Sequence, residues 1–479
     1  MKIVMVSSEM APFAKTGGLA DVLGTLPGAL ARHGHDVSVF IPLYRCVDSS
    51  SAEFLLQEGV ALGPRHAAFS IFRLARHDGV TVYGIRKEEF FDRDGLYGTN
   101  EREFEDNAER FIFFSKAVVQ SILSLRLEPD IVHAHDWQTA LVPLYLKIYH
   151  EHQALPRIAT AFTIHNMAYQ GMFDAWHFSD TNLPGFFFSY DGLEFYGRLN
   201  LMKAGILYSD AVTTVSRRYA EEIQTPEFGH GLDGLLRSRH AAVHGILNGV
   251  DYSIWDPETD PHLPVNFNAE HPDGKASCKL GLLKALGMDG PAAAPLIGMV
   301  TRFAHQKGLD LMLPVIPEIM KRGVRLAILG NGEPGYEHAM WALVESYPGQ
   351  VGLRMGFDDP LAHQIYAGSD FLLMPSLYEP CGLSQLYAMR YGTIPIVRTT
   401  GGLDDTIHAW DAHTLTGTGF KFGPAESDAL LTAVDGALRA FGNARHLSAL
   451  RQNAMIADFS WEKSAVEYET LYKNILPHA

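Results

Sequence analysis

Glu379 stands where an apolar stretch at 371–374 ends and a helix expected over 382–391 begins. In open α/β sheets, ligands bind beyond the carboxyl ends of the strands, and the exposed N–H groups of a helix N-terminus there stabilise negative charge. A carboxylate at this position can bind a polar ligand. We therefore expect Glu379 to be a functional residue.

A glycine pair, Gly17-Gly18, follows the first apolar stretch of the chain and opens the first expected helix. Glycine lets a ligand approach the backbone closely, the helix N-terminus favours anions, and Lys15 adds a full positive charge. The alternative is an ordinary turn, in which glycine pairs are common. The lysine and its position favour phosphate binding. The segment matches neither G-x-G-x-x-G nor G-x-x-x-x-G-K-[ST], which removes the main support for a standard dinucleotide or P-loop site.

Two cations, Arg302 and Lys307, lie in one loop after a strand expected at 296–300. An arginine fork and a lysine point charge can hold a diphosphate and stabilise the charge that builds on a departing phosphate. The alternative is that both are ordinary solvated surface side chains. Their place at the carboxyl end of a strand, in an acidic protein, favours the functional interpretation.

Glycine-containing loops follow two further strands of the second half. Gly330 comes after one strand, and Thr400-Gly401 comes after another and leads into a helix expected near Leu403. Each loop alone can be a simple turn. Because the ends of parallel strands meet at one edge of a sheet, we expect these loops to lie beside those of Glu379 and Arg302.

The first half carries polar residues after two apolar strands, His133, His135 and Asp136 after one and His165 after the next. Alternation places His133 and His135 on the same face, which suggests a metal site, but a convincing third ligand is missing. For Asp136 the rival role is capping the following helix, and for His165 it is that of a core histidine. Asp92-Arg93-Asp94 can suggest a metal-binding carboxylate pair, but it lacks a clean preceding strand and is interpreted as a loop.

Short β-rich stretches alternate with helical ones in both halves, which predicts α/β architecture with mostly parallel sheets. The expected strands are 3–7, 36–41, 81–85, 131–134, 159–164 and 211–215 in the first half, and 296–300, 325–329, 351–355, 371–374 and 394–397 in the second. Helices are expected at 18–33 and 103–125. The breaker-rich stretch 256–264 puts a junction near 250–265, with domains at 1–250 and 251–459, and a final helix within 460–479 that can pack on either domain, including back on the first.

Composition excludes several classes of protein. The chain has 479 residues, 47% of them apolar, enough for two large domains, and its net charge of −16 disfavours nucleic acid and anionic membranes as partners. Three scattered cysteines suit a reducing compartment, so we expect the cytoplasm. The apolar opening is too short for a signal peptide, and no apolar run is long enough to span a membrane.

Together these residues resemble the glycogen and starch synthase family, glycosyltransferase family 5, over essentially the whole chain. The resemblance rests on an ordered series of motifs: Lys15-Thr16-Gly17-Gly18-Leu19-Ala20-Asp21-Val22, His133-Ala134-His135-Asp136-Trp137, Thr163-Ile164-His165-Asn166, Leu247-Asn248-Gly249-Val250-Asp251, Arg302 with Gln306-Lys307-Gly308-Leu309-Asp310, Glu379-Pro380-Cys381-Gly382-Leu383, and Thr400-Gly401-Gly402-Leu403.

The resemblance implies a GT-B architecture, two Rossmann-like, doubly wound domains facing each other across a deep cleft, with the nucleotide sugar bound mainly by the second. It implies glucose transfer from ADP-glucose to the non-reducing end of an α-1,4-glucan, such as glycogen or a malto-oligosaccharide, with retention and without a cofactor or catalytic metal. The implied catalytic residues are Glu379, His165, Asp136, Arg302 and Lys307. The implied substrate-binding residues are Lys15, Gly17, Gly18, Asp21, Tyr97, Asn166, Asn248, Gly330, Phe357, Cys381, Gly382, Leu383, Thr400 and Gly401.

Two positions depart from related patterns. Phe357 stands where relatives often have a tyrosine that stacks on adenine, so the ring is kept and the hydroxyl is lost. Phe371 fills the first of the paired glutamate positions of many retaining GT-B enzymes, a departure that family 5 shares. The short N-terminus fits the bacterial members better than the plastid ones. The alternatives are an idle glucan-binding protein, a synthase that prefers UDP-glucose, and a pyridoxal phosphate-dependent glucan degrader.

Overall fold

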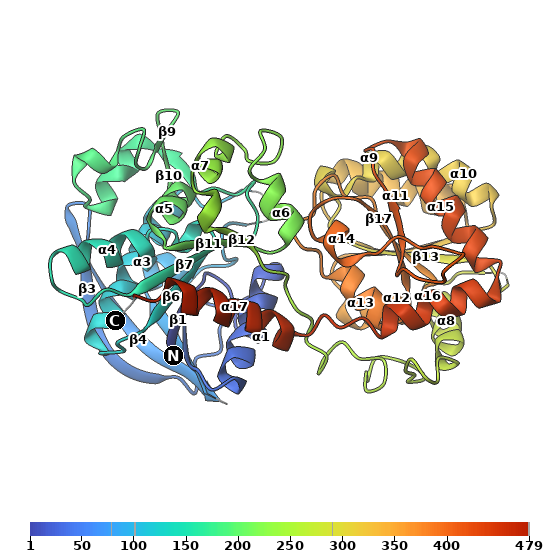
Figure 1. Ribbon diagram of the computed structural model, residues 1–479, viewed down its shortest axis with the longest axis horizontal. Helices are drawn as coiled ribbons and strands as arrows, with labels where there is room; N and C mark the ends of the chain where they lie inside the picture. Colours follow the sequence, from blue (N-terminus) through green and yellow to red (C-terminus); the bar gives the residue numbers. More distant parts are fainter. Residues whose placement is uncertain (78, 100–101, 290, 478–479) are drawn as a thin grey trace. The chain divides into compact units, whose positions relative to one another are not determined.

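The computed structural model describes residues 1–77, 79–99, 102–289 and 291–477, in two compact units. The first unit comprises Met1–Gly249 together with Trp461–Ala479, and the second comprises Val250–Ser460. Each unit holds its own sheet with helices against it (Figure 1). The chain therefore crosses from the first unit to the second at Gly249 and returns at Trp461.

The first unit is built on a sheet whose described strands follow the order β12-β11-β7-β6-β1-β2-β5-β4-β3. Neighbours from β12 to β5 pair in parallel, and β3 and β4 add an antiparallel hairpin at one edge. The bounds are β1 Lys2–Val6, β2 Asp36–Pro42, β3 Glu53–Leu62, β4 Arg65–His77, β5 Val80–Arg86, β6 Ile131–His135, β7 Ala159–Ile164, β11 Ala211–Thr214 and β12 Val243–Gly245. A small antiparallel sheet contains β8 Met172–Asp174, β9 Glu194–Phe195 and β10 Arg198–Asn200.

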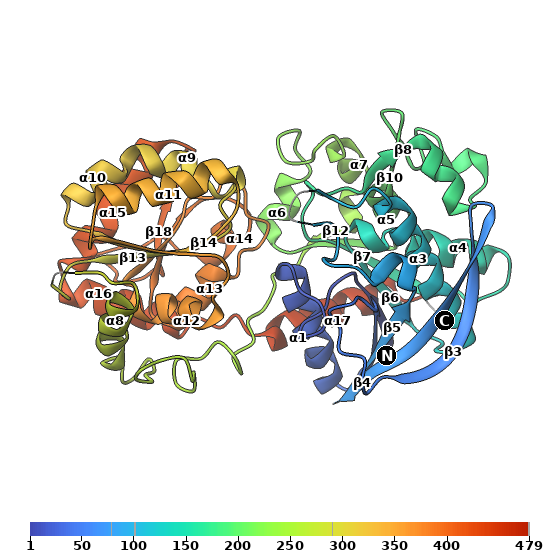
Figure 2. The same ribbon diagram turned by 180° about the vertical axis from the view of Figure 1, so that it is seen from behind.

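Helices cover this sheet, and the last helix of the chain is one of them. Their bounds are α1 Gly18–Arg32, α2 Glu88–Phe91, α3 Asn107–Ser124, α4 Val142–Glu151, α5 Leu201–Tyr208, α6 Arg217–Glu222, α7 Asp233–Ser238 and α17 Trp461–Ile475. In α17, Trp461, Tyr468 and Tyr472 recur at helical spacing and are buried in one core with Leu23 of α1. Figures 1 and 2 both show α17 beside α1. The C-terminal helix thus belongs structurally to the first unit.

The second unit has a parallel sheet whose described strands follow the order β15-β14-β13-β16-β17-β18. The strands are β13 Leu296–Val300, β14 Arg325–Gly330, β15 Val351–Met355, β16 Phe371–Met374, β17 Ile394–Arg398 and β18 Phe420–Phe422. The helices are α8 Gly274–Ala285, α9 Leu309–Met312, α10 Ile316–Lys321, α11 Pro334–Ser346, α12 Asp359–Gly368, α13 Ser384–Arg390, α14 Gly401–Thr406, α15 Ser427–Phe441 and α16 Ala444–Met455. The order runs outward in both directions from β13 and β16, which is the switch point where ligands bind in such sheets.

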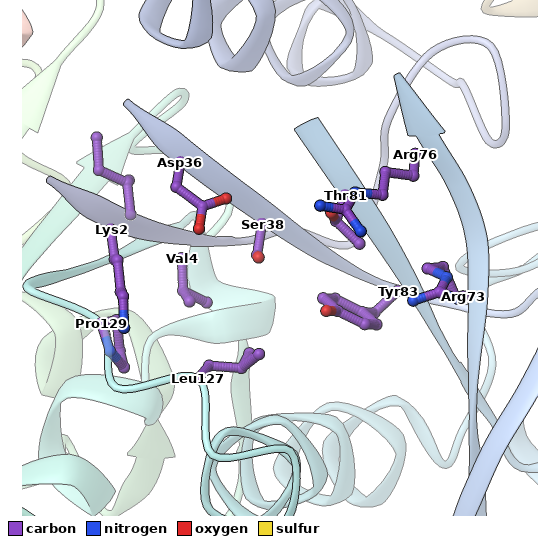
Figure 3. Close-up of a pocket in the computed structure, with 11 residues that line it drawn as sticks. Lys2, Val4, Asp36, Ser38, Arg73, Arg76, Thr81, Tyr83, Leu127 and Pro129 are labelled. Atoms are coloured by element: carbon purple, nitrogen blue, oxygen red, sulfur yellow. The ribbon is translucent and has the colours of Figure 1, made fainter. Parts of the chain in front are cut away.

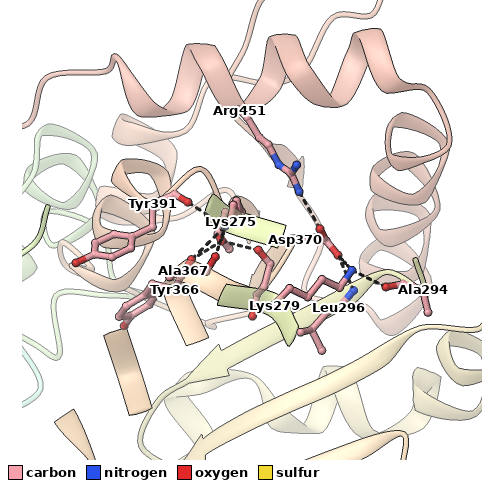
Figure 4. Close-up of polar contacts among 11 residues, drawn as sticks. Lys275, Lys279, Ala294, Leu296, Tyr366, Ala367, Asp370, Tyr391 and Arg451 are labelled. Atoms are coloured by element: carbon pink, nitrogen blue, oxygen red, sulfur yellow. Dashed lines mark hydrogen bonds and ion pairs between the residues drawn. The ribbon is translucent and has the colours of Figure 1, made fainter. Parts of the chain in front are cut away.

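Buried polar contacts fasten α8 to the second sheet (Figure 4). Lys275 Nζ donates to the carbonyl oxygens of Ala367 and Tyr391 at 2.8 and 2.9 Å. Lys279 Nζ and Arg451 Nη2 bind the two carboxylate oxygens of Asp370 at 2.6 and 2.8 Å. Each buried ammonium has partners, as burial of charge requires. These charged groups therefore have a structural role in the second unit.

The expected α/β class is confirmed, and the expected strands recur within a residue or two at each end. The helix expected over 103–125 begins at Asn107, and that expected over 382–391 begins at Ser384 because Gly382 has a positive φ of 72°. The hairpin of β3 and β4, the small sheet and β18 were not expected. Asp92 and Asp94 lie in a loop, as expected, where both bind the guanidinium of Arg45.

A cavity of about 160 Å³ lies against the first sheet, where Arg73, Arg76, Asp36 and Tyr83 line it (Figure 3). Its walls include Lys2, the first residue of β1, and Asp36, the first residue of β2. Ligands of open α/β sheets bind at the carboxyl ends of strands instead. This cavity is therefore not the candidate site.

Among the described residues, no helix is both long enough and apolar enough to cross a lipid bilayer.

Candidate active site

Glu379 lies in the loop between β16 and α13, where it forms a partly buried ion pair with Lys307. Lys307 Nζ donates to Glu379 Oε2 at 2.7 Å, and Ser376 Oγ donates to the same oxygen at 2.9 Å. The carboxylate is 7% exposed. Lys307 comes from the loop after β13, the strand next to β16, so the pair forms at the switch point of the sheet.

The backbone around Glu379 is fixed by the loops on both sides. Leu377 N–H donates to Gln306 O at 2.8 Å, and Gly402 N–H donates to Glu379 O at 3.0 Å. A Cβ added to Gly401, whose φ is +44°, would stand 2.0 Å from Glu379 O. Glycine is therefore required here so that two loops can pack together. The sequence predicted anion-binding N–H groups at this turn, but the N–H of Gly402 is already occupied by the Glu379 loop.

The other residues predicted in the second unit lie at the same edge of the sheet. Arg302 is exposed in the loop that also carries Lys307, and Phe357, which follows β15, is 84% exposed. Gly330 is the last residue of β14. A Cβ there would lie 2.0 Å from Thr301 O, so a glycine is needed for these segments to pack closely. Cys381, Gly382, Leu383 and Thr400 complete the edge between β16 and β17.

In the first unit, Lys15 lies in the exposed loop before α1. Its Nζ forms an ion pair at 2.6 Å with Asp21 in the first turn of α1. A buried residue that was not predicted, Glu9, holds this loop in place. Glu9 accepts the N–H groups of Thr16 and Gly17 at 2.6 and 3.3 Å. These two amides are therefore hydrogen-bonded within the loop. The candidates that are left for binding an anion are Lys15, which is exposed and paired with Asp21, and the N-terminus of α1.

Tyr97 is tied to the same carboxylate. Its hydroxyl donates to Glu9 Oε1 at 2.7 Å and lies 2.7 Å from Ser8 Oγ. Burial and the nearby Glu9 raise the pKa of Tyr97 well above its usual value, so the hydroxyl stays protonated. Tyr97 and the Lys15 loop thus share the carboxylate of Glu9, and the predicted contact of Tyr97 with the substrate stays a prediction.

Asp136 follows β6 with a φ of +55°, a conformation that is costly for a residue with a side chain. Its Oδ1 accepts the N–H of His165 at 2.7 Å, across from β6 to β7. Burial raises the pKa of Asp136 to about 7 in spite of these backbone hydrogen bonds. The carboxylate is thus not a helix cap, because it positions His165, and it changes charge near neutral pH.

His165, which is partly buried, begins a line of histidines that continues with the buried His135 and His133. Its Nε2 lies 3.0 Å from His135 Nδ1, and the rings of His135 and His133 are 4.1 Å apart. Burial lowers the pKa of His165 and of His133 to about 3, so both rings are neutral at pH 7. His133 Nδ1 and Nε2 lie 2.8 and 2.6 Å from Tyr472 Oη and Thr163 Oγ1. Because both nitrogens are occupied, His133 is a structural residue, and the metal site considered for it is disfavoured.

The two predicted asparagines differ in their contacts. Asn166 Oδ1 accepts the N–H of Ala168 at 3.0 Å and so closes the turn after β7. Asn248 is 5% exposed, and its Oδ1 has no hydrogen-bond partner among the described residues. An unsatisfied buried acceptor is costly unless a ligand donates to it. Asn248 is therefore a binding candidate, whereas Asn166 has a local structural role as well.

Family comparisons agree with this geometry. The model for the starch synthase catalytic domain matches residues 2–238, and that for glycosyl transferases group 1 matches residues 291–454. The chain is 45% identical to the glycogen synthase of Opitutus terrae, over 99% of this chain and 100% of that protein. It is 46% identical to the glycogen synthase of Koribacter versatilis, over 99% and 98% of the two chains.

Solved structures give the same result. The catalytic domain of starch synthase IV from Arabidopsis thaliana, bound to ADP and acarbose, matches with a TM-score of 0.91 and 35% identity over 99% of each chain. A sucrose-phosphate synthase from Thermosynechococcus elongatus matches with a TM-score of 0.61 at 17% identity, which supports the GT-B fold alone. Since relatives named glycogen synthase align over essentially the full chain, the chain belongs to the glycogen and starch synthase family of glycosyltransferases.

Proposed function

We propose that the chain transfers glucose from ADP-glucose to the non-reducing end of an α-1,4-glucan, with retention of configuration and release of ADP. The observation that carries the proposal is the partly buried Lys307–Glu379 pair at the switch point of the second sheet. The starch synthase structure that this chain resembles is bound to ADP and acarbose, which supports a nucleotide donor and a glucan acceptor.

The positive groups of the second unit act on the donor diphosphate. In the proposed reaction, the bond between glucose C1 and the phosphate oxygen breaks, and C1 bonds to the acceptor hydroxyl oxygen on the same face. The hydroxyl proton passes to the departing phosphate. Lys307 and Arg302 stabilise the charge that builds on that phosphate, an effect worth about 3 kcal/mol for one well-placed donor. Phe357, exposed after β15, offers a face for adenine.

Glu379 acts on the sugar. A retaining transfer passes through a transition state with oxocarbenium character, so positive charge develops at C1. A carboxylate held by Lys307 and Ser376 accepts hydrogen bonds from glucosyl hydroxyl groups and offsets that charge. Cys381, Gly382, Leu383, Thr400 and Gly401 shape the edge around it.

The first unit contacts the sugar and, through the Lys15 loop, the phosphates. His165, a neutral imidazole, and Asp136 contact the glucosyl group, and the unsatisfied Oδ1 of Asn248 accepts a hydrogen bond from a further hydroxyl group. Lys15 and Gly18 meet the phosphates, with Gly17, Asp21 and Tyr97 shaping that loop. The proposed reaction uses residues of both units. It needs no catalytic metal and no pyridoxal phosphate in this scheme, and the proposed compartment is the cytoplasm.

Incubation with glucose-labelled ADP-glucose and glycogen tests the proposal. We expect label in the polymer, release of ADP in equal amount, and removal of the label by an enzyme specific for α-1,4 bonds. Absence of polymer-bound label would leave an idle glucan-binding protein as the explanation. Competition between ADP-glucose and UDP-glucose separates the proposed donor from the alternative one, because faster transfer from UDP-glucose would contradict the ADP assignment.

A further inference from the structure

A cluster of two histidines and one aspartate lies in the second unit, and no step of the proposed transfer uses it. His262 belongs to the segment that precedes α8, and Asp359 and His363 are one turn apart on α12. Residues four apart on a helix share one face. One ligand atom from each of the three side chains lies within 4.8 Å of the others.

His363 presents an unused ring nitrogen to this cluster. The side chain is 2% exposed, and its Nδ1 lies 2.7 Å from Asp260 Oδ2. A carboxylate beside Nδ1 holds the proton there, which leaves the lone pair on Nε2. Nε2 has no hydrogen-bond partner among the described residues, and it lies 3.9 Å from Asp359 Oδ2. A buried nitrogen with a free lone pair is suited to bind a cation.

Asp260 supplies the support that a metal ligand needs. Besides contacting His363, it accepts the hydroxyl of Tyr391 at 2.5 Å and the N–H of His262 at 2.8 Å. The indole of Trp255 stacks on the His363 ring at 3.9 Å. One buried carboxylate thus orients one ligand and fixes the backbone of another. Such a carboxylate–histidine arrangement behind a ligand is the usual outer shell of a zinc site.

We propose that His262, Asp359 and His363 bind a Zn²⁺ ion. Two imidazoles and one carboxylate suit zinc, with water at the fourth position. Tetrahedral ligands stand about 3.4 Å apart when their bonds are about 2.0–2.1 Å, so the site must contract slightly. Asp359 is half-exposed and can rotate toward the ion. His262 is only partly buried, so an ion can reach the cluster from solvent. The ion would fasten the segment after the junction to α12.

Zinc titration of the full chain tests the site. The protein is first dialysed against a chelator and then titrated with Zn²⁺ in competition with a chromophoric chelator. We expect a single tightly bound ion per chain, and His262→Ala and Asp359→Asn each weaken its binding at least about tenfold. His271→Ala removes an exposed histidine of the same segment outside the cluster and serves as the matched control, with unchanged binding.

Thermal unfolding gives a second measurement, because an ion that binds only the folded chain raises its stability. Zn²⁺ is expected to raise the unfolding temperature of the unmodified chain and of His271→Ala, and not that of His262→Ala. His363→Ala is a poor test, since removal of this buried ring can itself unfold the unit. The proposal is overturned by absence of stoichiometric zinc binding, or by tight binding that persists in either His262→Ala or Asp359→Asn.

Discussion

The two units present different chemistry at the carboxyl edges of their sheets. The second unit holds an ion pair, Lys307 with Glu379, within one hydrogen-bonded loop system. The first unit holds groups whose charged forms are disfavoured by burial. The pKa of His165 is lowered to about 3, so the ring is neutral, and the pKa of Asp136 is raised to about 7. Fixed charge suits a diphosphate that departs with negative charge, whereas neutral hydrogen-bonding groups suit the hydroxyls of a sugar. In the proposed reaction, the difference gives departure of the diphosphate mainly to the second unit and orientation of the sugar mainly to the first.

The largest effect is expected for Glu379→Gln. The amide keeps the shape but cannot offset the charge at C1, and it also leaves Lys307 without its counter-ion. We expect kcat to fall about 10²–10³-fold with a smaller change in donor KM, measured by initial rates of ADP release. Ser376→Ala, which removes one hydrogen bond to the same oxygen, is the control and should lose far less. A kcat for Glu379→Gln near that of the unmodified enzyme would remove Glu379 from the mechanism.

Lys307→Ala should lower kcat/KM for the donor by about 10²-fold, because the ammonium meets the diphosphate both before and during departure. Initial rates over a range of ADP-glucose concentrations measure it. Lys321→Ala, which removes an exposed lysine paired with Glu318 at the surface of α10, is the matched control for loss of one positive charge. Equal kinetics in the two variants would show that Lys307 has no special role.

Asp136 predicts a pH dependence of stability. Its folded pKa of about 7 lies above the unfolded value, so between about pH 4 and 7 the folded chain holds a proton that the unfolded chain has lost. Stability therefore falls as pH rises through this window, by up to about 4 kcal/mol, and Asp136→Asn should flatten the decline. Denaturant unfolding at several pH values measures the slope. The same slope in Asp136→Asn would contradict the assignment.

A smaller effect is expected at the far end of the histidine line. Tyr472→Phe removes the hydroxyl beside His133 and should lower the free energy of unfolding by about 1 kcal/mol. Because the described contacts connect His165 to His133 through His135, we expect kcat to fall a few-fold with little change in donor KM. Tyr468→Phe, a neighbouring buried tyrosine of α17, is the control for packing. A change in donor KM without a change in kcat would contradict this role of the three histidines, because it would indicate an effect on donor binding and not on glucose transfer.

The strands were predictable because buried parallel strands have continuous apolar stretches, as in 296–300 and 371–374. The hairpin of β3 and β4 was missed because β3 is mostly exposed and a bulge between Phe54 and Leu56 interrupts its alternation. Propensity alone does not identify such an edge.

The position of a candidate residue was predictable where it lies in the loop that follows a strand, as Lys307, Glu379 and Asp136 do. Glu9 also follows a strand, and that position was the available signal. Its role depends on Tyr97, far along the chain, and no local pattern connects the two. The contact between His133 and Tyr472 joins residues still farther apart, so only the fold reveals it.

Calorimetric titration of ADP tests the division between the units most directly. The account predicts that Lys307→Ala weakens ADP binding at least about tenfold, whereas Asp136→Asn binds ADP with the affinity of the unmodified chain and still loses glucose transfer. Normal ADP affinity in Lys307→Ala, or a loss of ADP affinity in Asp136→Asn as large as that in Lys307→Ala, would contradict it.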